Sequence, residues 1–467
     1  MAPAALVLAG LVPLIWPGDI PFINDEPQLI AGAVDANLGG RLATMGLLGT
    51  YGFVYGPAPV WVYQALMAAS HDLVIVAVLH ALLMSVVTAA ALWWLSRSLG
   101  LWVWFAPLPL LSPYYWFYAR VLWDNTFLLP LGALALAGYA AHLQSESPLG
   151  LRVSLAAMAA IPLVHLMGAS LVLPLAAHML IVERRALWAR KYSIAAIAAA
   201  ALWLGWPYWT YLAGPRPATP GDGPALGGFV FPLLGGRLLG AQGLDYFFGP
   251  GPVGGRLFGG LAALSGIAYA LVWGGLAVAL VLIARARWSR QWTARAHIAA
   301  IAVASLVCES VIHGISARFQ HPHYQNGVWI SLVVLAWLAV DFLATRRGPV
   351  RIVRIVGWAA PVAAGLLAAT LVGAVGLLAF GLHRSRGTRD IYGPTIANQQ
   401  QVARALARYA QTSDVQIHVN MWERFPHTIA ILRRLNVSHR ADLPQRVLEV
   451  RYVTDDPASG AIEMVER

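Results

Sequence analysis

The chain has 467 residues, of which 59% are apolar and only 11% are charged. That balance excludes a water-soluble globular protein and predicts a polytopic, all-α membrane protein. The net charge of +11 does not indicate nucleic-acid binding, because much of it lies in short breaks between apolar stretches. The single cysteine, Cys308, excludes a disulfide within the chain.

Apolar stretches long enough to cross a bilayer recur along the sequence. Basic breaks, such as those at Arg97, Arg185 and Arg287, occupy every second gap between them, which is typical of cytoplasmic loops. The pattern predicts about eleven transmembrane helices, with the N-terminus inside and the C-terminus outside. Two short spans contain Pro162 and Pro174, which indicates tilted or partly re-entrant segments. The expected spans are 1–16, 73–95, 101–118, 127–142, 153–165, 168–182, 192–210, 263–284, 297–313, 326–344 and 355–382.

The first outer loop, residues 17–72, begins with two adjacent acids, Asp25 and Glu26. Pro27 follows, and an acid at the cap position with proline in the first turn is typical of a helix start. A helix N-terminus favours the ionised form of a nearby carboxylate. A plain helix cap without any further role is the alternative. Two interfacial helices are expected in this loop, one before Gly39 and one after residues 55–59.

The short loop between the third and fourth spans crowds Arg120, Asp124 and Asn125 beside the membrane. Charged side chains at that position are costly unless they have partners. An Arg120–Asp124 ion pair at i, i+4 that only fixes the loop is one interpretation. The other is a site at the outer surface of the membrane.

A third cluster, Arg318, His321, His323 and Tyr324, lies between the ninth and tenth spans. Two histidines do not complete a metal site, although a divalent metal remains possible. With Arg318 they could instead bind an anionic headgroup, and plain interfacial anchoring is the third interpretation. Three such clusters on separate outer loops predict one site at the outer membrane boundary. The near absence of charge at the midplane disfavours an ion-coupled transporter.

After residue 383 the composition changes to that of a soluble protein. Helical patterns cover 399–409 and 428–435, and strand patterns cover 415–419, 447–453 and 461–465. The sequence therefore predicts two domains. Residues 1–383 form the transmembrane catalytic domain, and residues 384–467 form a small α/β domain outside the membrane.

The order of Asp25-Glu26, interfacial helices and the proline stretch at 55–59 resembles the GT-C membrane glycosyltransferases. The similarity is strongest to the protein O-mannosyltransferase and lipid A aminoarabinose transferase group. The loops at residues 120–125 and 321–324 also look like outer loops of that group. The resemblance covers the transmembrane half of the chain in order and topology.

Two positions depart from the family pattern. Tyr55 and Gly56 stand where the family often has a Lys or His before the prolines, and Leu29 or Ile30 replaces an aromatic residue. A cation for a donor phosphate is therefore expected from Arg120 or Arg318. Replacing Arg318 with alanine is expected to lower turnover by about two to three orders of magnitude.

The resemblance implies an inverting glycosyltransferase that moves a sugar from a polyprenyl-phosphate donor to an acceptor hydroxyl on the outer face. Asp25 would act as the base, and Glu26 would orient the acceptor or the loop. No cofactor is implied. The residues expected to bind substrate are Asp124, Arg120, Asn125, Tyr55, Arg318, His321, His323 and Tyr324.

Two other classes remain open, a polyprenyl-diphosphate-dependent glycan ligase or polymerase and a lipid-linked sugar transporter. The Arg-rich, Lys-poor composition indicates a bacterial source, so the expected location is the inner membrane with the site and the C-terminal domain facing the periplasm. The expected partners are the donor, a lipid, glycan or protein acceptor, and membrane lipids, with no nucleic acid.

Overall fold

The computed structural model describes most of the chain, and the account below is confined to those residues. They are 2–23, 25–49, 54–214, 252–316, 321–345, 351–389, 392–419, 443–454 and 459–467, with single positions 230, 235, 244, 247 and 428. Side chains are described for these residues except at 252–261, 316 and 351–361.

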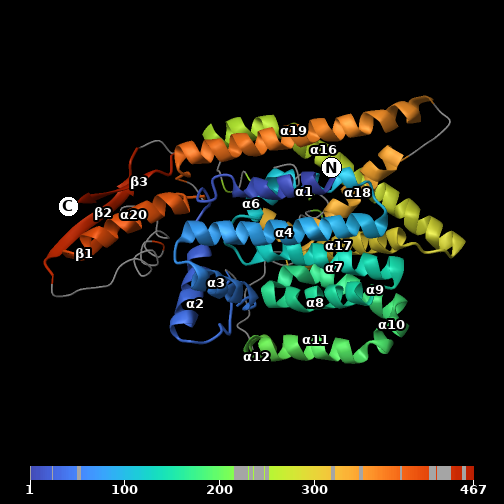
Figure 1. The fold of residues 1–467 in the computed structure, drawn as a ribbon, viewed down its shortest axis with the longest axis horizontal. Coiled ribbons are helices and arrows are strands. Elements are labelled where there is room, and N and C mark those ends of the chain that lie inside the picture. The colour runs from blue at the N-terminus through green and yellow to red at the C-terminus, as the bar shows by residue number, and fades with distance from the viewer. Residues whose placement is uncertain are drawn as a thin grey trace.

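The larger part of the molecule is a bundle of apolar helices that coincide with the predicted spans (Figure 1). Within the described residues, five helical segments are long and apolar enough to cross a membrane, and five shorter apolar ones accompany them. The predicted polytopic helical fold is confirmed. The helices are α1 (Ala2–Leu11), α4 (Leu73–Leu99), α7 (Leu128–Ser145), α8 (Pro148–Val164), α9 (Ala169–Val182), α11 (Lys191–Leu204), α16 (Pro252–Ser289), α17 (Ala294–Ser316), α18 (Trp329–Thr345) and α19 (Arg351–Ser385).

The predicted span 101–118 is not one helix but three short ones. They are η2 (Val103–Phe105), α5 (Leu108–Leu111) and α6 (Pro113–Tyr118). Prolines at 107, 109 and 113 interrupt the run because each lacks an N–H donor and restricts the residue before it. The segment is largely buried in the bundle, where irregular backbone is tolerated at membrane depth.

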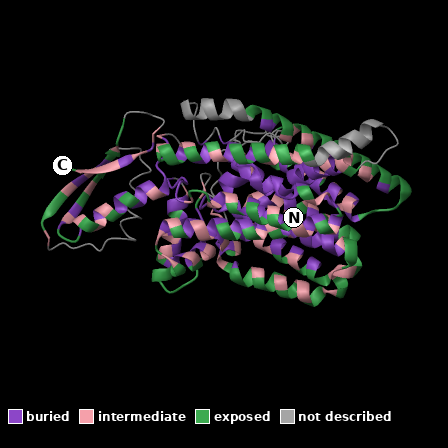
Figure 2. Cartoon of the chain, turned by 45° about the horizontal axis from the view of Figure 1, so that its top comes forward, coloured by how far each residue is buried: buried purple, intermediate pink, exposed green. Residues whose placement is uncertain are grey.

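The interior of the bundle is closely packed, and its peripheral helices are not. Figure 2 shows buried residues concentrated in the middle of the bundle, with exposed and half-buried residues on the helices around it. A Cβ at Gly138 of α7 would lie 2.6 Å from the Gly150 carbonyl oxygen of α8. Small residues at such a crossing let two apolar helices approach closely, as they do in membrane proteins.

Two helices precede α4, as predicted for the first loop: α2 (Glu26–Leu38) and α3 (Ala58–Ala69). They pack against each other beside one end of α4 (Figure 1). Gln64 of α3 donates to Asn37 Oδ1 at 3.0 Å and to the Arg41 carbonyl at 2.9 Å. Gly40, with φ of +60°, reverses the chain after α2. These bonds hold the end of α2 against α3.

The C-terminal part contains α20 (Ile396–Tyr409) and a three-stranded sheet of β1 (Asp414–Val419), β2 (Gln445–Tyr452) and β3 (Ile462–Glu466). β1 and β2 are parallel, and β3 is antiparallel to β2. A separate apolar core that includes Leu406, Leu448 and Ile462 joins helix and sheet. All three predicted strands and the first predicted helix are confirmed. The predicted helix at 428–435 lies outside the described residues except for position 428.

Candidate functional site

Asp25 stands at the start of α2, but its side chain does not cap the helix. Its Oδ2 instead accepts a hydrogen bond of 2.7 Å from Nε1 of Trp123. The expected cap role of this side chain is therefore wrong, whereas Pro27 occupies the first turn as predicted. A donor that holds a carboxylate favours its ionised form. The carboxylate is thus held toward the loop at residues 120–125.

Trp123 joins the three sequence clusters. Its carbonyl accepts hydrogen bonds from Tyr63 of α3 at 3.3 Å and from Thr126 at 2.7 Å. Its ring contacts that of His323, with the centroids 4.6 Å apart. Asp25, the 120–125 loop and the 321–324 segment therefore meet at one end of the bundle.

Asp124 is 1% exposed, and only one of its two carboxylate oxygens has a hydrogen-bond partner among the described residues. Its Oδ1 accepts from the Asn125 N–H at 2.7 Å, while Oδ2 has no hydrogen-bond partner among the described residues. Burial, and then the charges of Asp25 and Glu26, raise the pKa of Asp124 well above its ordinary value. A buried acid with a raised pKa and an oxygen that lacks a partner among the described residues, beside a second carboxylate, is typical of a catalytic or binding site.

Glu26 lies in the same buried region, with 3% exposure. Burial, followed by the charges of Asp124 and Glu26, raises the pKa of Tyr63. Two acids, Asp124 and Glu26, therefore lie close enough to act on one buried tyrosine. Arg318, expected from the sequence to lie near them, is outside the described residues.

Asn125 is fixed by two residues that the sequence did not single out. Asn326 donates to Asn125 Oδ1 at 2.8 Å, and the Tyr114 hydroxyl donates to Asn326 Oδ1 at 2.7 Å. Asn326 lies in η6 (Pro322–Gly327), directly after the His321–Tyr324 cluster. In the sequence, only the position of Asn326 next to that cluster indicates it as a site residue. No sequence feature indicates Tyr114.

The histidines of η6 form a stacked group. The His321 and His323 rings have centroids 5.2 Å apart, and Tyr324 lies 4.5 Å from His323. Burial and the neighbouring His321, His165 and His313 lower the pKa of His323 well below its ordinary value. In the described part of the chain, no three His, Cys, Asp or Glu side chains come close enough to hold a metal ion. His323 is thus a neutral side chain, and its Nδ1 has no partner among the described residues.

Tyr55 lies against His165, the residue after α8, with ring centroids 3.8 Å apart. A Cβ at Gly56 would overlap the Leu163 carbonyl oxygen, so glycine is required where this stretch meets α8. His165 Nδ1 accepts from the Met167 N–H at 3.1 Å. Burial lowers the pKa of His165 to about 3. This imidazole therefore does not replace the cation that the 55–59 stretch lacks.

Arg120 faces away from the acids. Its guanidinium donates to the carbonyls of Ile15 at 3.3 Å and of Trp16 and Asp19 at 2.7 Å each. It also lies over the Trp116 ring, at 4.5 Å from the centroid. The alternative of an Arg120–Asp124 ion pair is wrong, since both residues are described and no ion pair joins them. A phosphate contact also does not fit, because Arg120 is 1% exposed and its donors serve backbone carbonyls.

Residues 15–23, called the lead segment below, connect α1 to Asp25. Opposite Arg120, the segment is held by the C-terminal part of the chain. The backbone N–H of Ile396 donates to the Ile20 carbonyl, and that of Ala397 to the Gly18 carbonyl, both at 3.0 Å. The first turn of α20 is therefore joined directly to the chain that leads to the site.

Side chains strengthen this junction. Gln399 and Thr428 both donate to the Phe22 carbonyl, at 3.1 and 3.0 Å. The Tyr392 hydroxyl donates to the Asp19 carbonyl at 2.6 Å. The position of Asp25, three residues beyond Phe22, thus depends on contacts from the end of the chain.

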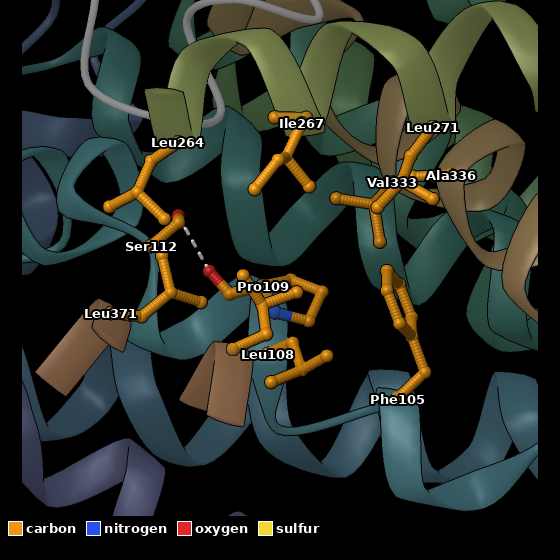
Figure 3. Close-up of a pocket in the computed structure, with 12 residues that line it drawn as sticks. Phe105, Leu108, Pro109, Ser112, Leu264, Ile267, Leu271, Val333, Ala336 and Leu371 are labelled. Carbon is orange, nitrogen blue, oxygen red and sulfur yellow. Dashed lines mark hydrogen bonds between the residues drawn. The ribbon is translucent and has the colours of Figure 1, made fainter. Parts of the chain in front are cut away.

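An apolar cavity of about 60 Å³ lies deeper in the bundle, between α5, α16, α18 and α19. Figure 3 shows Phe105 and Leu108 facing Ile267 and Val333 across it. The hydroxyl of Ser112 donates to the Pro109 carbonyl at 2.8 Å, so it needs no other partner. No ionisable residue lines this cavity, and it is separate from the acids.

No protein-family model matches the chain, and no curated protein matches it in sequence. Among the solved structures that match it in fold is ArnT from Cupriavidus metallidurans, both bound to undecaprenyl phosphate (17% identity, TM-score 0.51) and in the apo state (16%, 0.52). Each match covers 96% of this chain and 92% of ArnT. The chain shares the fold of ArnT. At this identity the likeness concerns the fold alone, and it supports the predicted GT-C-like, polytopic architecture.

Proposed function

We propose that this protein is an inverting glycosyltransferase that uses a polyprenyl-phosphate sugar donor and an acceptor hydroxyl at the membrane surface. The proposal is supported by the ArnT-like fold, since one ArnT structure contains undecaprenyl phosphate. The observation that carries it is the pairing of Asp25, held by Trp123, with the buried and half-satisfied Asp124. Such a transfer requires a base for the acceptor hydroxyl, whereas the lipid phosphate leaves without being protonated.

Asp25 is the proposed general base. It accepts the proton of the acceptor hydroxyl as that oxygen forms a bond to the anomeric carbon of the sugar. The bond between this carbon and the phosphate oxygen breaks on the opposite face, and the lipid phosphate leaves with the electron pair. Attack from the face opposite the leaving group inverts the anomeric centre. Glu26, in the next position and buried, orients the acceptor or the start of α2.

Asp124 is proposed to bind the donor sugar. Its raised pKa favours the protonated carboxyl group, and in that form the group donates a hydrogen bond to a sugar hydroxyl. Asn125 and Tyr55 complete this side of the site. Arg120 is assigned a positioning role, because it holds the lead segment that carries Asp25.

The donor phosphate is proposed to lie against η6. Neutral His321 and His323 provide ring N–H donors, and Tyr324 adds a hydroxyl. Arg318 precedes them in sequence and supplies the fixed charge that a leaving phosphate needs. The Arg318→Ala protein is expected to lose about two to three orders of magnitude in turnover, and Arg318→Lys to recover part of it.

The polyprenyl tail is proposed to enter the apolar cavity from the lipid side of α16 and α19. Ala268 of α16 lines that cavity and is half-buried. Ala268→Phe is expected to raise KM for the donor several-fold with little change in kcat. Ala270→Phe, on an exposed position of the same helix, is the matched control. Equal donor KM in both variants would place the tail elsewhere.

The site is proposed to face the periplasm of a bacterial inner membrane. Single cysteines introduced at Asp35, on the exposed face of α2, and at Arg290, after α16, test this in intact cells. A membrane-impermeant maleimide is expected to label position 35 and not position 290. Labelling of both, or of 290 alone, would reverse the assignment.

Asp25→Asn is the direct test of the reaction. This isosteric change removes the base and retains an oxygen that can accept the Trp123 hydrogen bond, so turnover is expected to fall at least about 10³-fold with normal insertion. Asp35→Asn, at an exposed position of the same helix, should retain full turnover. Donors carrying polyprenyl monophosphate and diphosphate should be compared in parallel. Turnover with the diphosphate alone would replace this proposal with a glycan ligase or polymerase.

A further inference from the structure

The C-terminal part carries a groove of its own. It has a volume of about 640 Å³ and runs between α20 and the open edge of the sheet. We call it the α20 groove, and its lining includes Gln401, Arg408, Tyr409, Thr412, Arg446 and Met464. Its size lies within the range of sites that hold small molecules. Nothing in the proposed transfer step uses these residues.

One end of the α20 groove carries two arginines. Arg446 lies over the Tyr409 ring, 6.0 Å from its centroid, and bonds Glu466 at 3.1 Å. Both members of that ion pair are nearly half exposed, so the pair contributes little energy. An incoming carboxylate or phosphate can therefore take the place of Glu466. Arg408 is exposed nearby and offers a second cation for the same anion.

The rest of the lining suits a sugar. The Gln401 amide and the Thr412 hydroxyl offer both donors and acceptors. The Tyr409 ring and Met464 give apolar surfaces against which the C–H face of a sugar ring can pack. Amide, hydroxyl, aromatic and guanidinium groups together match an acidic saccharide better than they match an apolar ligand.

The α20 groove is connected to the proposed active site through α20 itself. Seven lining residues lie along this helix and its end, from Asn398 to Thr412. The first turn, at the Asn398 end, is bonded to the lead segment through Ile396 and Ala397. A helix of 14 residues spans roughly 21 Å. A saccharide in the groove is therefore directed along α20 toward the segment that carries Asp25.

We propose that the α20 groove binds an acidic saccharide portion of the acceptor, with its carboxylate or phosphate on Arg408 and Arg446. This rests on the proposed glycosyltransferase function. In this proposal the C-terminal part recognises the acceptor at a place distant from the hydroxyl that reacts. The donor side of the site is not involved.

The test uses full-length protein in lipid nanodiscs, titrated by calorimetry with oligogalacturonate as the acidic probe and neutral galactose oligomers of equal length as the comparison. Arg446→Ala is expected to weaken oligogalacturonate binding at least ten-fold. Arg451→Ala, which breaks the exposed Arg451–Glu463 pair on the same strand outside the groove, should bind as wild type. Thr412→Trp, which fills the groove and removes no charge, should also abolish binding.

Three results would overturn the proposal. They are equal binding of the neutral oligomers, unchanged binding by Arg446→Ala and Thr412→Trp, or binding by wild type to phosphatidylglycerol vesicles in place of the saccharide. The Asp25→Asn protein keeps the groove and should bind oligogalacturonate normally. An active Asp25→Asn protein would therefore count against the proposed reaction, whereas loss of saccharide binding counts against the groove alone.

Discussion

The two ends of the transmembrane bundle both bury polar and charged side chains, but they satisfy them differently. At the end that carries Arg295, the charges of Arg295 and Asp341 are paired with each other. Arg295 donates to Asp341 Oδ2 at 2.8 Å and to the carbonyls of Leu99, at 2.6 Å, and Gly100. Asp341 Oδ1 accepts from the Trp102 N–H at 2.8 Å.

At the end that carries Asp25, the arrangement is incomplete. Asp124 Oδ2 and His323 Nδ1 are buried and have no partner among the described residues. Leaving such a group unsatisfied costs about 1–3 kcal/mol each. A fold retains that cost where a ligand supplies the missing partner. The comparison teaches that the paired Arg295–Asp341 group, the saturated end, holds α4, α17 and α18 together, while the incomplete Asp25 end fits the substrate site proposed there.

The largest expected effect is on turnover, which matched substitutions at the two ends should change differently. Asp124→Asn is expected to lower turnover about 10²- to 10³-fold, because it alters a group proposed to bind the donor sugar. Asp341→Asn, the same change at the saturated end, should leave turnover per folded molecule unchanged. Steady-state kinetics of both purified proteins give the answer. Equal losses in the two variants would remove the distinction.

The indole groups offer a second pair. Trp123→Phe keeps an aromatic ring but removes the donor to Asp25, a bond to a carboxylate worth roughly 1.5–3 kcal/mol. Turnover is expected to fall about 10- to 100-fold, with the activity–pH profile shifted because Asp25 loses a stabilising donor. Trp337→Phe removes the corresponding bond to the Trp102 carbonyl, 2.9 Å long, and should change neither. An unchanged profile in Trp123→Phe would mean that the bond does not tune the base.

The free energies of unfolding of these two variants should rank in the opposite order to their losses of turnover. Asp341→Asn leaves Arg295 without its counter-charge, and it is expected to cost about 1–3 kcal/mol, with the partial exposure of Arg295 keeping the loss at the lower end. Asp124→Asn should not destabilise the protein, because it removes a buried acid that lacks one partner. Thermal unfolding in one detergent compares the two. A larger loss in Asp124→Asn would contradict the assignment of the two ends.

The smallest expected effect is the dependence of stability on pH. Because the pKa of Asp124 is raised, the folded protein keeps a proton that the unfolded chain releases above about pH 4. Stability from this group therefore falls as the pH rises toward the raised pKa. Asp124→Asn should reduce that decline in melting temperature between pH 4.5 and 8. Parallel curves for the two proteins would contradict the raised pKa.

The sequence predicted those features that depend on local pattern. Apolar length located the spans, and alternation located strands such as 447–453, which the structure places at Gln445–Tyr452. The acids Asp25 and Glu26 were identified by position alone. Family resemblance added the GT-C architecture, which periodicity could not supply.

Contacts between distant parts of the chain could not be predicted. Trp123 lies 98 residues from Asp25, and Asn326 lies 201 residues from Asn125, so no local spacing relates them. Arg120 shows that a local spacing can also predict a contact that the structure does not contain. Its spacing from Asp124 fits a helical ion pair, but backbone carbonyls more than a hundred residues earlier take its donors. Buried carbonyls need donors as strongly as charges need partners.

The junction between the lead segment and the start of α20 sets an order of events in biosynthesis. The lead segment leaves the ribosome long before its partners at 392–399 and 428, which follow it in the chain. Domains generally fold as the chain emerges, N-terminal parts first. The segment before Asp25 must therefore wait, with several carbonyls unpaired, until the C-terminal part arrives beside it. A nascent chain can assemble its bundle without completing this junction, so the segment before Asp25 takes its final position only after residues 392–428 have been made.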